Sequence, residues 1–194
     1  DNIVIVPHEH NYKITSNNFT KVFNSHPIQL GAGKEYWWGI NTRYSSSLQF
    51  GDSFKNESVV VDLDESKKDS WNVFGFSPYQ WMHVDLSSIY SSSAIKFKLK
   101  ANELPKLQVI LFTYTGERRR LQKTLNESNF VVKKNGIYEA YLPLKSLMGY
   151  SEFRWNDLKE IRFRVLEGNQ FEIGDFELIE FRGNPKKPTE WKGI

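Results

Sequence analysis

The sequence contains no cysteine among its 194 residues. This absence excludes a disulfide scaffold, a thiolate zinc site and a cysteine nucleophile. Apolar runs are also short, and because none approaches the length of a bilayer-spanning helix, no membrane span is predicted. The opening residues, DNIVIVPHEH, lack the basic and then apolar pattern of a leader. We therefore expect a soluble protein, either with its export signal removed or as one part of a longer chain.

Several catalytic and cofactor motifs are missing as well. GAGKEY at 31–36 lacks the longer glycine spacing of a phosphate loop and the hydroxyl residue after the lysine. His8 and His10 are two residues apart and offer two metal ligands without a third. No Gln-x-His segment occurs, although jelly-roll polysaccharide lyases carry one. The sequence therefore predicts no catalytic residue.

The sequence also lacks a strong excess of either positive or negative charge. The 26 basic and 23 acidic residues are interspersed and give a net charge of +3. Such a weak positive field does not capture nucleic acid, so no nucleic-acid partner is predicted.

Aromatic residues, in contrast, are abundant. The 14 phenylalanines, 9 tyrosines and 6 tryptophans exceed what a core of this size usually absorbs, so some rings are expected to face solvent. They lie in short alternating or β-branched segments separated by Gly, Asn, Ser, Asp and Pro clusters, a pattern typical of a sandwich or barrel. Strands are predicted at 2–6, 11–15, 20–23, 35–40, 57–63, 70–75, 80–85, 94–101, 107–114, 120–125, 137–142, 160–166 and 170–181.

The fold class that follows is an all-β jelly-roll sandwich of two antiparallel sheets with at most short helical turns. In AIKFKLKA at 94–101 apolar and lysine side chains alternate, which predicts one buried and one solvated face. LQVILFTY at 107–114 is almost continuously apolar and predicts a central strand that forms a hairpin with the next strand. One helical turn is expected within 142–150, closed by Gly149, and another is expected where Asn156 caps residues 157–159.

The length favours one domain, at 1–183. Two prolines and three lysines in NPKKPTEWKGI predict a linker or tail at 184–194.

From about residue 69 to 182 the order of features resembles the galactose-binding-domain-like jelly-roll carbohydrate-binding modules of bacterial polysaccharide-degrading enzymes. The matching segments, in order, are WNVFGF, VDLSSIYSSSAIKFKLKA, LQVILFTYTGE, GIYEAYLPLKSL, DLKEIRFRV and FEIGDFELIEF. The closing strand of that group commonly carries an acidic pair, and Gly174 and Asp175 hold that place here. The resemblance thus implies Asp175 as the ligand of a structural calcium ion, a secreted or cell-surface bacterial setting and an attached catalytic domain.

Carbohydrate binding needs flat apolar platforms for sugar rings, surrounded by polar groups that bind hydroxyls. Tyr36, Trp37, Trp38 and Arg43 form the best local concentration of both. Adjacent residues of a strand point to opposite faces, so one tryptophan is available to a ligand and the other belongs to the core. The alternative is that both are buried.

Three further positions complete the predicted ligand-binding set. Tyr79 and Trp81 flank a loop that contains Pro78, and packing around that loop is their alternative role. Arg118 opens a run of three arginines that suits a sulfated or uronic polysaccharide, or else forms a solvated loop. Trp155 either extends a platform or plugs the end of the sandwich.

These residues favour a non-catalytic module that binds a polysaccharide or oligosaccharide and targets an attached glycan-degrading enzyme. Two alternatives stay open: a jelly-roll lyase or glycoside hydrolase, and a protein-recognition or adhesion sandwich.

Overall fold

The computed structural model describes the chain in segments. Backbone is described for residues 3–5, 12–14, 20–22, 28–29, 37–38, 48–54, 58–63, 73–76, 83–113, 120–132, 135–150, 152–168 and 170–181. Side chains are described from residue 51 onward within these segments, except at 76, 83, 84 and 132.

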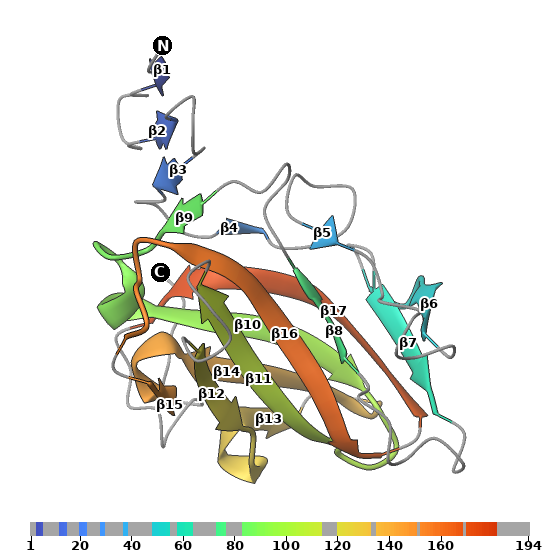
Figure 1. Ribbon diagram of the computed structural model, residues 1–194. Helices are drawn as coiled ribbons and strands as arrows, with labels where there is room; N and C mark the ends of the chain where they lie inside the picture. Colours follow the sequence, from blue (N-terminus) through green and yellow to red (C-terminus); the bar gives the residue numbers. More distant parts are fainter. Residues whose placement is uncertain are drawn as a thin grey trace.

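The described residues form a β-sandwich of two sheets (Figure 1). The front sheet in Figure 1 has eight strands in the described part, with the order β15-β12-β11-β16-β8-β5; β9 also pairs with β16, and β3 pairs with β9. Its strands are β3 (Thr20–Val22), β5 (Trp37–Trp38), β8 (Val73–Phe76), β9 (His83–Asp85), β11 (Lys106–Thr113), β12 (Arg120–Thr124), β15 (Met148–Gly149) and β16 (Leu158–Glu167). Its pairings are antiparallel except that of β3 with β9, which is parallel.

The back sheet has seven described strands, in the order β13-β14-β10-β17-β7-β6, with β4 paired to β17. They are β4 (Ile28–Gln29), β6 (Leu48–Gly51), β7 (Ser58–Asp62), β10 (Ser93–Lys100), β13 (Phe130–Val132), β14 (Ile137–Pro143) and β17 (Gln170–Glu180). A separate pair, β1 (Ile3–Ile5) and β2 (Tyr12–Ile14), forms a small ribbon.

The predicted jelly-roll sandwich is therefore confirmed. Helical structure in the described residues is limited to the single 3-10 turns η3 (Tyr90–Ser92), η4 (Glu127–Asn129) and η5 (Leu144–Ser146). The turn predicted within 142–150 is present as η5, but Gly149 lies in β15 and does not close it. The turn predicted at 157–159 is wrong, because the chain enters β16 at Leu158.

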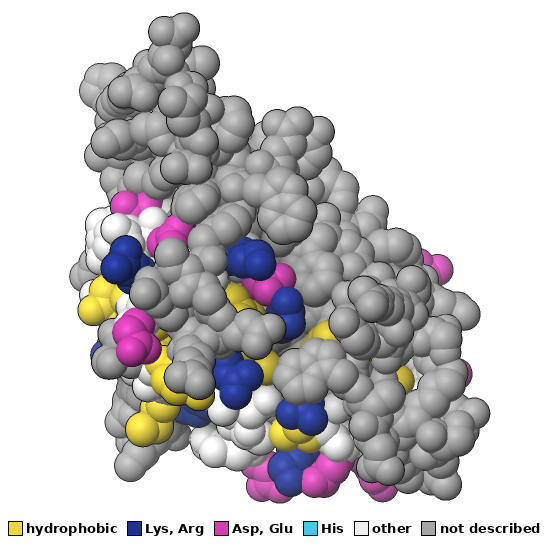
Figure 2. Space-filling model, viewed as in Figure 1, with side chains coloured by type: hydrophobic (Ala, Val, Ile, Leu, Met, Phe, Trp, Pro, Cys, Tyr) yellow, Lys and Arg dark blue, Asp and Glu magenta, His cyan; other side chains and the backbone are white. Residues whose placement is uncertain are grey.

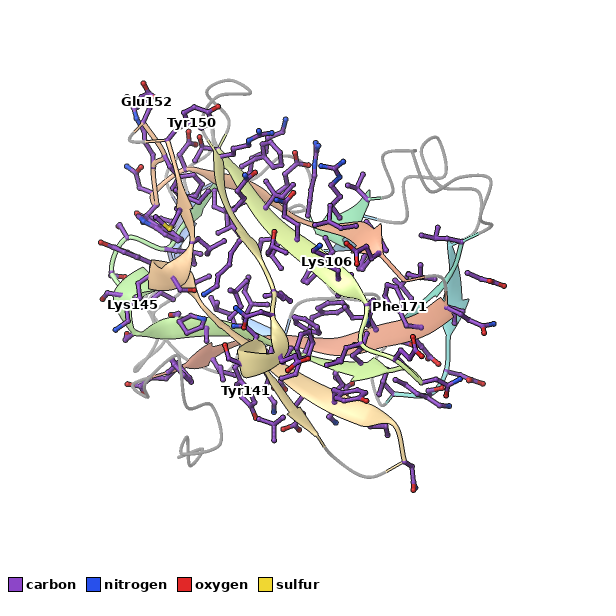
Figure 3. All side chains as sticks on the ribbon, turned by 90° about the horizontal axis from the view of Figure 1, so that it is seen from below. Lys106, Tyr141, Lys145, Tyr150, Glu152 and Phe171 are labelled. Carbon is purple, nitrogen blue, oxygen red and sulfur yellow. The ribbon has the colours of Figure 1, made fainter. Side chains whose placement is uncertain are left out.

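One core lies between the two sheets. The inward residues of β11 and β16, among them Val109 and Phe163, meet those of β10 and β17. Phe163 stacks on Phe74 at 5.3 Å between ring centroids and contacts Phe97 edge-on at 5.4 Å. In Figure 3, which views the layers edge-on, Phe171 lies between them, whereas Tyr150 and Tyr141 lie on opposite outer sides. Both sheets therefore pack against the same apolar core.

Candidate ligand-binding face

The outer face of the eight-stranded sheet, here called the front face, consists of the alternate strand residues that point away from the core. In β16 the residues Ile161, Phe163 and Val165 are buried in the core, so Glu160, Arg162 and Arg164 project from the other side. In β11 the same alternation leaves Gln108, Ile110 and Phe112 on the front face. Ile110 is fully buried although it does not belong to the core between the sheets.

The strand register places one residue from each of six strands of this sheet in a single row that runs across the strands. Each residue of the row is the direct partner of the next, and the row runs through Met148, Gln122, Ile110, Arg162, Gly75 and Trp38. Directly paired residues of an antiparallel sheet share a face. With strands about 4.8 Å apart, the row spans about 24 Å from β15 to β5. An elongated surface therefore crosses the whole sheet.

Two flanking rows widen this surface. On one side, Arg120 pairs with Phe112, which pairs with Glu160. The backbone N–H of Tyr150 donates to the carbonyl oxygen of Arg120 at 3.2 Å and continues that row beyond β12. On the other side the row consists of Thr124, Gln108, Arg164 and Val73. Met148 and Tyr150 are 77% and 45% exposed, so the β15 end of the surface is open to solvent.

Arg162 is held flat at the centre of the face. Its guanidinium carbon lies 4.4 Å from the centroid of the Phe112 ring, and its Nη2 donates to Glu160 Oε1 at 2.5 Å. Glu160 is buried, while the side chain of Arg162 keeps 28% of its surface exposed. Stacking on an aromatic ring and an ion pair each restrict a guanidinium, so its position is set before any ligand arrives.

Figure 2, drawn in the same view, shows dark-blue Lys and Arg side chains across the middle of this face, over β11, β12 and β16. Gly75 contributes no side chain to the central row, in which its position lies between those of Trp38 and Arg162. A Cβ added there would lie 2.1 Å from the carbonyl oxygen of Ile161, so any larger residue would push β8 away from β16.

The outer face of the seven-stranded sheet, here called the back face, uses its charges differently. Lys98 Nζ binds Asp175 Oδ2 at 2.7 Å and Lys96 Nζ binds Glu177 Oε2 at 3.5 Å. Asp175 occupies a β-bulge between β17 and β10 with φ of 50°. The hydrogen bond to Asp175 raises the pKa of Lys98, against the opposing effect of burial.

Two further groups on the back face titrate away from their ordinary values. Burial, and then the hydrogen bond that its hydroxyl donates to Glu139 (2.8 Å), raises the pKa of Tyr141. Burial alone would raise the pKa of Glu172. Hydrogen bonds donated to its carboxylate by Ser53 and Ser58, with nearby Lys100, instead hold that pKa below its ordinary value. The charges of this face thus stabilise one another.

The structure locates part of the predicted ligand-binding set. Tyr36, Arg43, Tyr79, Trp81 and Arg118 lie outside the described residues. Trp37 and Trp38 form β5, described by its backbone alone. Trp38 shares the row of Gly75 and Arg162, whereas Trp37 pairs with Phe76, in the row of the core residue Ile161.

Trp155 is half-buried and packs against the core. Its ring stacks on Tyr90 at 4.5 Å and meets Phe153 edge-on at 4.9 Å. These contacts pack Trp155 into the fold, and both of its predicted roles, as a plug at the end of the sandwich and as a ligand contact, stay predictions.

Asp175 stays a prediction as a calcium ligand. Its carboxylate is paired with Lys98, and among the residues that the structure describes no three His, Cys, Asp or Glu side chains gather as metal ligands. Likewise, no helix in the described part of the chain is long and apolar enough to cross a membrane.

Sequence reasoning missed several residues of the front face: Gln108, Phe112, Gln122, Met148, Tyr150, Arg162 and Arg164. The alternation of Glu160, Arg162 and Arg164 with apolar neighbours was a usable signal, because it matches the pattern of 94–101. The cross-strand row required the register.

No protein-family model matches the chain, and no curated protein matches its sequence. Solved structures do match its fold. The family 30 carbohydrate-binding module of a cellulosomal cellulase of Clostridium thermocellum superposes with a TM-score of 0.58 at 16% identity, over 82% of this chain and 100% of that chain.

The fold is similar to that of family 30 carbohydrate-binding modules. A second crystal structure of such a module matches with a TM-score of 0.54 at 17% identity, over 84% of this chain and 87% of that chain. A third matches with a TM-score of 0.50 at 15% identity, over 81% and 96%. The resemblance expected from the sequence is thus confirmed for the fold.

Proposed function

We propose that this chain is a non-catalytic carbohydrate-binding module that holds a polysaccharide on its front face and targets an attached glycan-degrading enzyme to that polysaccharide. The observation that carries the proposal is the row from Met148 to Trp38, which crosses six paired strands. A surface about 24 Å long suits a chain of sugars better than a single sugar. The similarity to family 30 modules supports the same function.

The side chains of the front face supply both kinds of contact that a sugar chain needs. Tyr150 and Phe112 provide aromatic surface, and we infer that Trp38 provides more at the β5 end. Arg164, Gln122 and their neighbours donate directed hydrogen bonds to hydroxyl groups. Binding by such contacts is weak per site, so the benefit to an attached enzyme comes from a raised local substrate concentration.

The predicted residues outside the described part fit this proposal through their place in the sequence. Tyr36 and Arg43 flank β5, Tyr79 and Trp81 lie between β8 and β9, and Arg118 precedes β12. All these strands belong to the eight-stranded sheet. We propose that these residues extend the front face, in a protein that works outside the bacterial cell.

Affinity electrophoresis tests the proposal. Wild-type protein is run through gels that contain neutral or acidic polysaccharides, while parallel assays measure reducing ends and unsaturated products. We expect retardation without product. Trp38→Ala, Gln122→Ala and Tyr150→Ala should each weaken retardation, because each shortens or interrupts the surface.

Lys100→Ala is the matched control, since Lys100 is an exposed residue on the back face. It should leave retardation unchanged. Product formation would replace the proposal with a lyase or hydrolase. The absence of retardation by any polysaccharide would refute carbohydrate binding and favour a protein partner.

A further inference from the structure

We propose that Met148 and Tyr150 form an apolar subsite that binds one sugar ring at the β15 end of the front face, so that the bound polysaccharide lies across the strands. This inference rests on the proposed function, and it assigns the place and the direction of the ligand on the same face.

The first observation is where the exposed apolar side chains lie. Among the residues that the structure describes, only Met148 and Tyr150 are large hydrophobic residues with exposed side chains. They are two positions apart, on either side of Gly149, which pairs with the core-packed Leu121. Alternation therefore places both side chains on the front face, and in Figure 3 Tyr150 lies on that outer side. Single exposed apolar residues are ordinary, but two on one face form a patch that a ligand can cover.

The second observation is that this patch continues the central row. Met148 is the direct partner of Gln122 on β12, and the backbone N–H of Tyr150 donates to the carbonyl oxygen of Arg120 at 3.2 Å. Gly149 permits this close approach, because a Cβ added there would lie 2.2 Å from the same carbonyl oxygen. A sugar chain that follows the row across the strands therefore reaches the patch without a change of direction.

The third observation is that the core holds the segment on both sides. Before the patch, Leu144 and Leu147 are buried in the core, and the N–H of Leu147 donates to the carbonyl oxygen of Leu144 at 3.1 Å. After it, Phe153 packs against the core, meets Trp155 edge-on and donates its N–H to the carbonyl oxygen of Tyr150 at 3.2 Å. A backbone fixed in this way lowers the ordering cost when a ligand binds.

The chemistry of the pair fits a sugar ring. The ring of Tyr150 offers a flat apolar surface to the CH groups of a pyranose, and its hydroxyl can donate to or accept from the hydroxyls at the edge of the sugar. The flexible thioether of Met148 adapts its shape to the ring beside it. Neither side chain is charged, so the subsite binds through apolar contact and does not require an acidic sugar.

Methyl NMR locates the ligand directly, because the chain has only two methionines. The protein is labelled with ¹³C at the methionine methyl groups, and Met148→Leu assigns the Met148 signal. The probes are cello-, xylo- and laminari-oligosaccharides from disaccharide to hexasaccharide, together with size-fractionated hydrolysates of any other polysaccharide that retards the protein. We expect the Met148 signal to shift as the longest oligosaccharide saturates the protein.

Calorimetry with the same oligosaccharides measures the contribution of Tyr150. Tyr150→Ala should weaken binding of the longest oligosaccharide about three- to tenfold, the range for one aromatic contact. The loss should be smaller for the disaccharide, because a short ligand can bind elsewhere along the row without reaching β15. Tyr150→Phe keeps the ring and should retain most of the affinity.

Lys145→Ala is the matched control, since Lys145 is an exposed residue of the same segment, in η5, and lies away from Tyr150 in Figure 3. It should leave binding at every length unchanged. Unfolding temperatures verify that each variant is folded.

The outcomes separate the two proposals. A Met148 signal that does not move while an oligosaccharide binds would overturn the subsite and leave carbohydrate binding intact. Unchanged affinity of Tyr150→Ala for the longest oligosaccharide, or an equal loss at every length, would also overturn it. Binding to no polysaccharide would refute the proposed function itself.

Discussion

The two outer faces of the sandwich use charged residues in different ways. On the back face Lys96 and Lys98 reach acidic partners on β17, and Glu172 accepts hydrogen bonds from Ser53 and Ser58. On the front face the described rows hold three arginines and one acidic residue, and the most exposed large apolar side chains among the described residues, Met148 and Tyr150, lie at the same sheet's edge.

We infer that the charged side chains of the back face serve the stability of the fold, whereas those of the front face are placed to contact a ligand. A charge that is paired within the fold lowers the free energy of the native state and has little left to offer a ligand. On the front face Arg162 is also ion-paired, with Glu160, but its side chain keeps 28% of its surface exposed on the face that we propose as the ligand-binding surface. We therefore expect substitutions on the back face to change stability and substitutions on the front face to change binding.

The largest effect is expected in the apolar core, against which both sheets pack. Phe163→Ala removes a fully buried ring that contacts Phe74, Phe97 and Phe176, and it should lower the free energy of unfolding by about 3–5 kcal/mol. Urea denaturation measures the change. Tyr150→Ala is the control, since the same kind of truncation at an exposed site should cost no more than about 0.5 kcal/mol. A loss below about 1 kcal/mol for Phe163→Ala would contradict the shared core.

A smaller effect is expected from the ion pair in the bulge of the back face. Asp175→Asn keeps a residue type that tolerates the positive φ but removes the charge that binds Lys98. Because the Lys98 side chain is about one-third exposed, the expected loss is only about 1–2 kcal/mol, with polysaccharide retardation unchanged.

Glu167→Gln is the matched control for this pair. It breaks a similarly short pair, Lys106 with Glu167 at 2.6 Å, in which both side chains are well exposed, so its cost should be near zero. Equal losses in the two variants would contradict the distinction drawn from burial. Repeating the measurement with calcium and with EDTA tests Asp175 as a calcium ligand: a bound ion should raise the unfolding temperature of the wild type and not that of Asp175→Asn.

The smallest effect concerns pH. The pKa of Glu172 is lower in the folded protein than its ordinary value of 4.5, so the carboxylate contributes stability that is present above that value. This contribution is lost as the pH falls through the folded pKa, because the folded protein then takes up the proton as well. Glu172→Gln should therefore destabilise the protein at neutral pH and flatten the acid side of the stability profile.

Chemical denaturation at a series of acidic pH values measures this profile. An unchanged slope in the Glu172→Gln protein would show that the hydrogen bonds from Ser53 and Ser58 do not favour the charged form. Front-face substitutions such as Arg164→Gln should leave the acid profile as it is.

Strand positions followed closely from the sequence because alternation and turn residues are local signals. The prediction at 94–101 matches β10 (Ser93–Lys100), and that at 107–114 matches the central strand β11 and its pairing with β12. The short strands β4, β6, β13 and β15 were not predicted. Each is only two to four residues long, too short for a periodic pattern to stand out, and is extended because a neighbouring strand offers hydrogen bonds.

The candidate site was predictable only in fragments. Local density of aromatic residues singled out Trp37 and Trp38, and alternation showed that they must face opposite sides, but not which one faces the ligand. The pairing of Trp38 with Gly75, and of Gly75 with Arg162, puts Trp38 in the cross-strand row of Arg162, and on that ground we propose Trp38 as the ligand contact. Arg162 and Phe112 are 50 residues apart in the sequence, and their contact arises because register places them on neighbouring strands.

The sequence by itself determined that this protein is an all-β sandwich without disulfides, because residue periodicity and composition act over a few residues at a time. The tertiary structure alone decided which charges neutralise one another and which collect on one face. The physical reason is that a sheet joins distant segments through register, and a shift of one residue would exchange every outward side chain for an inward one.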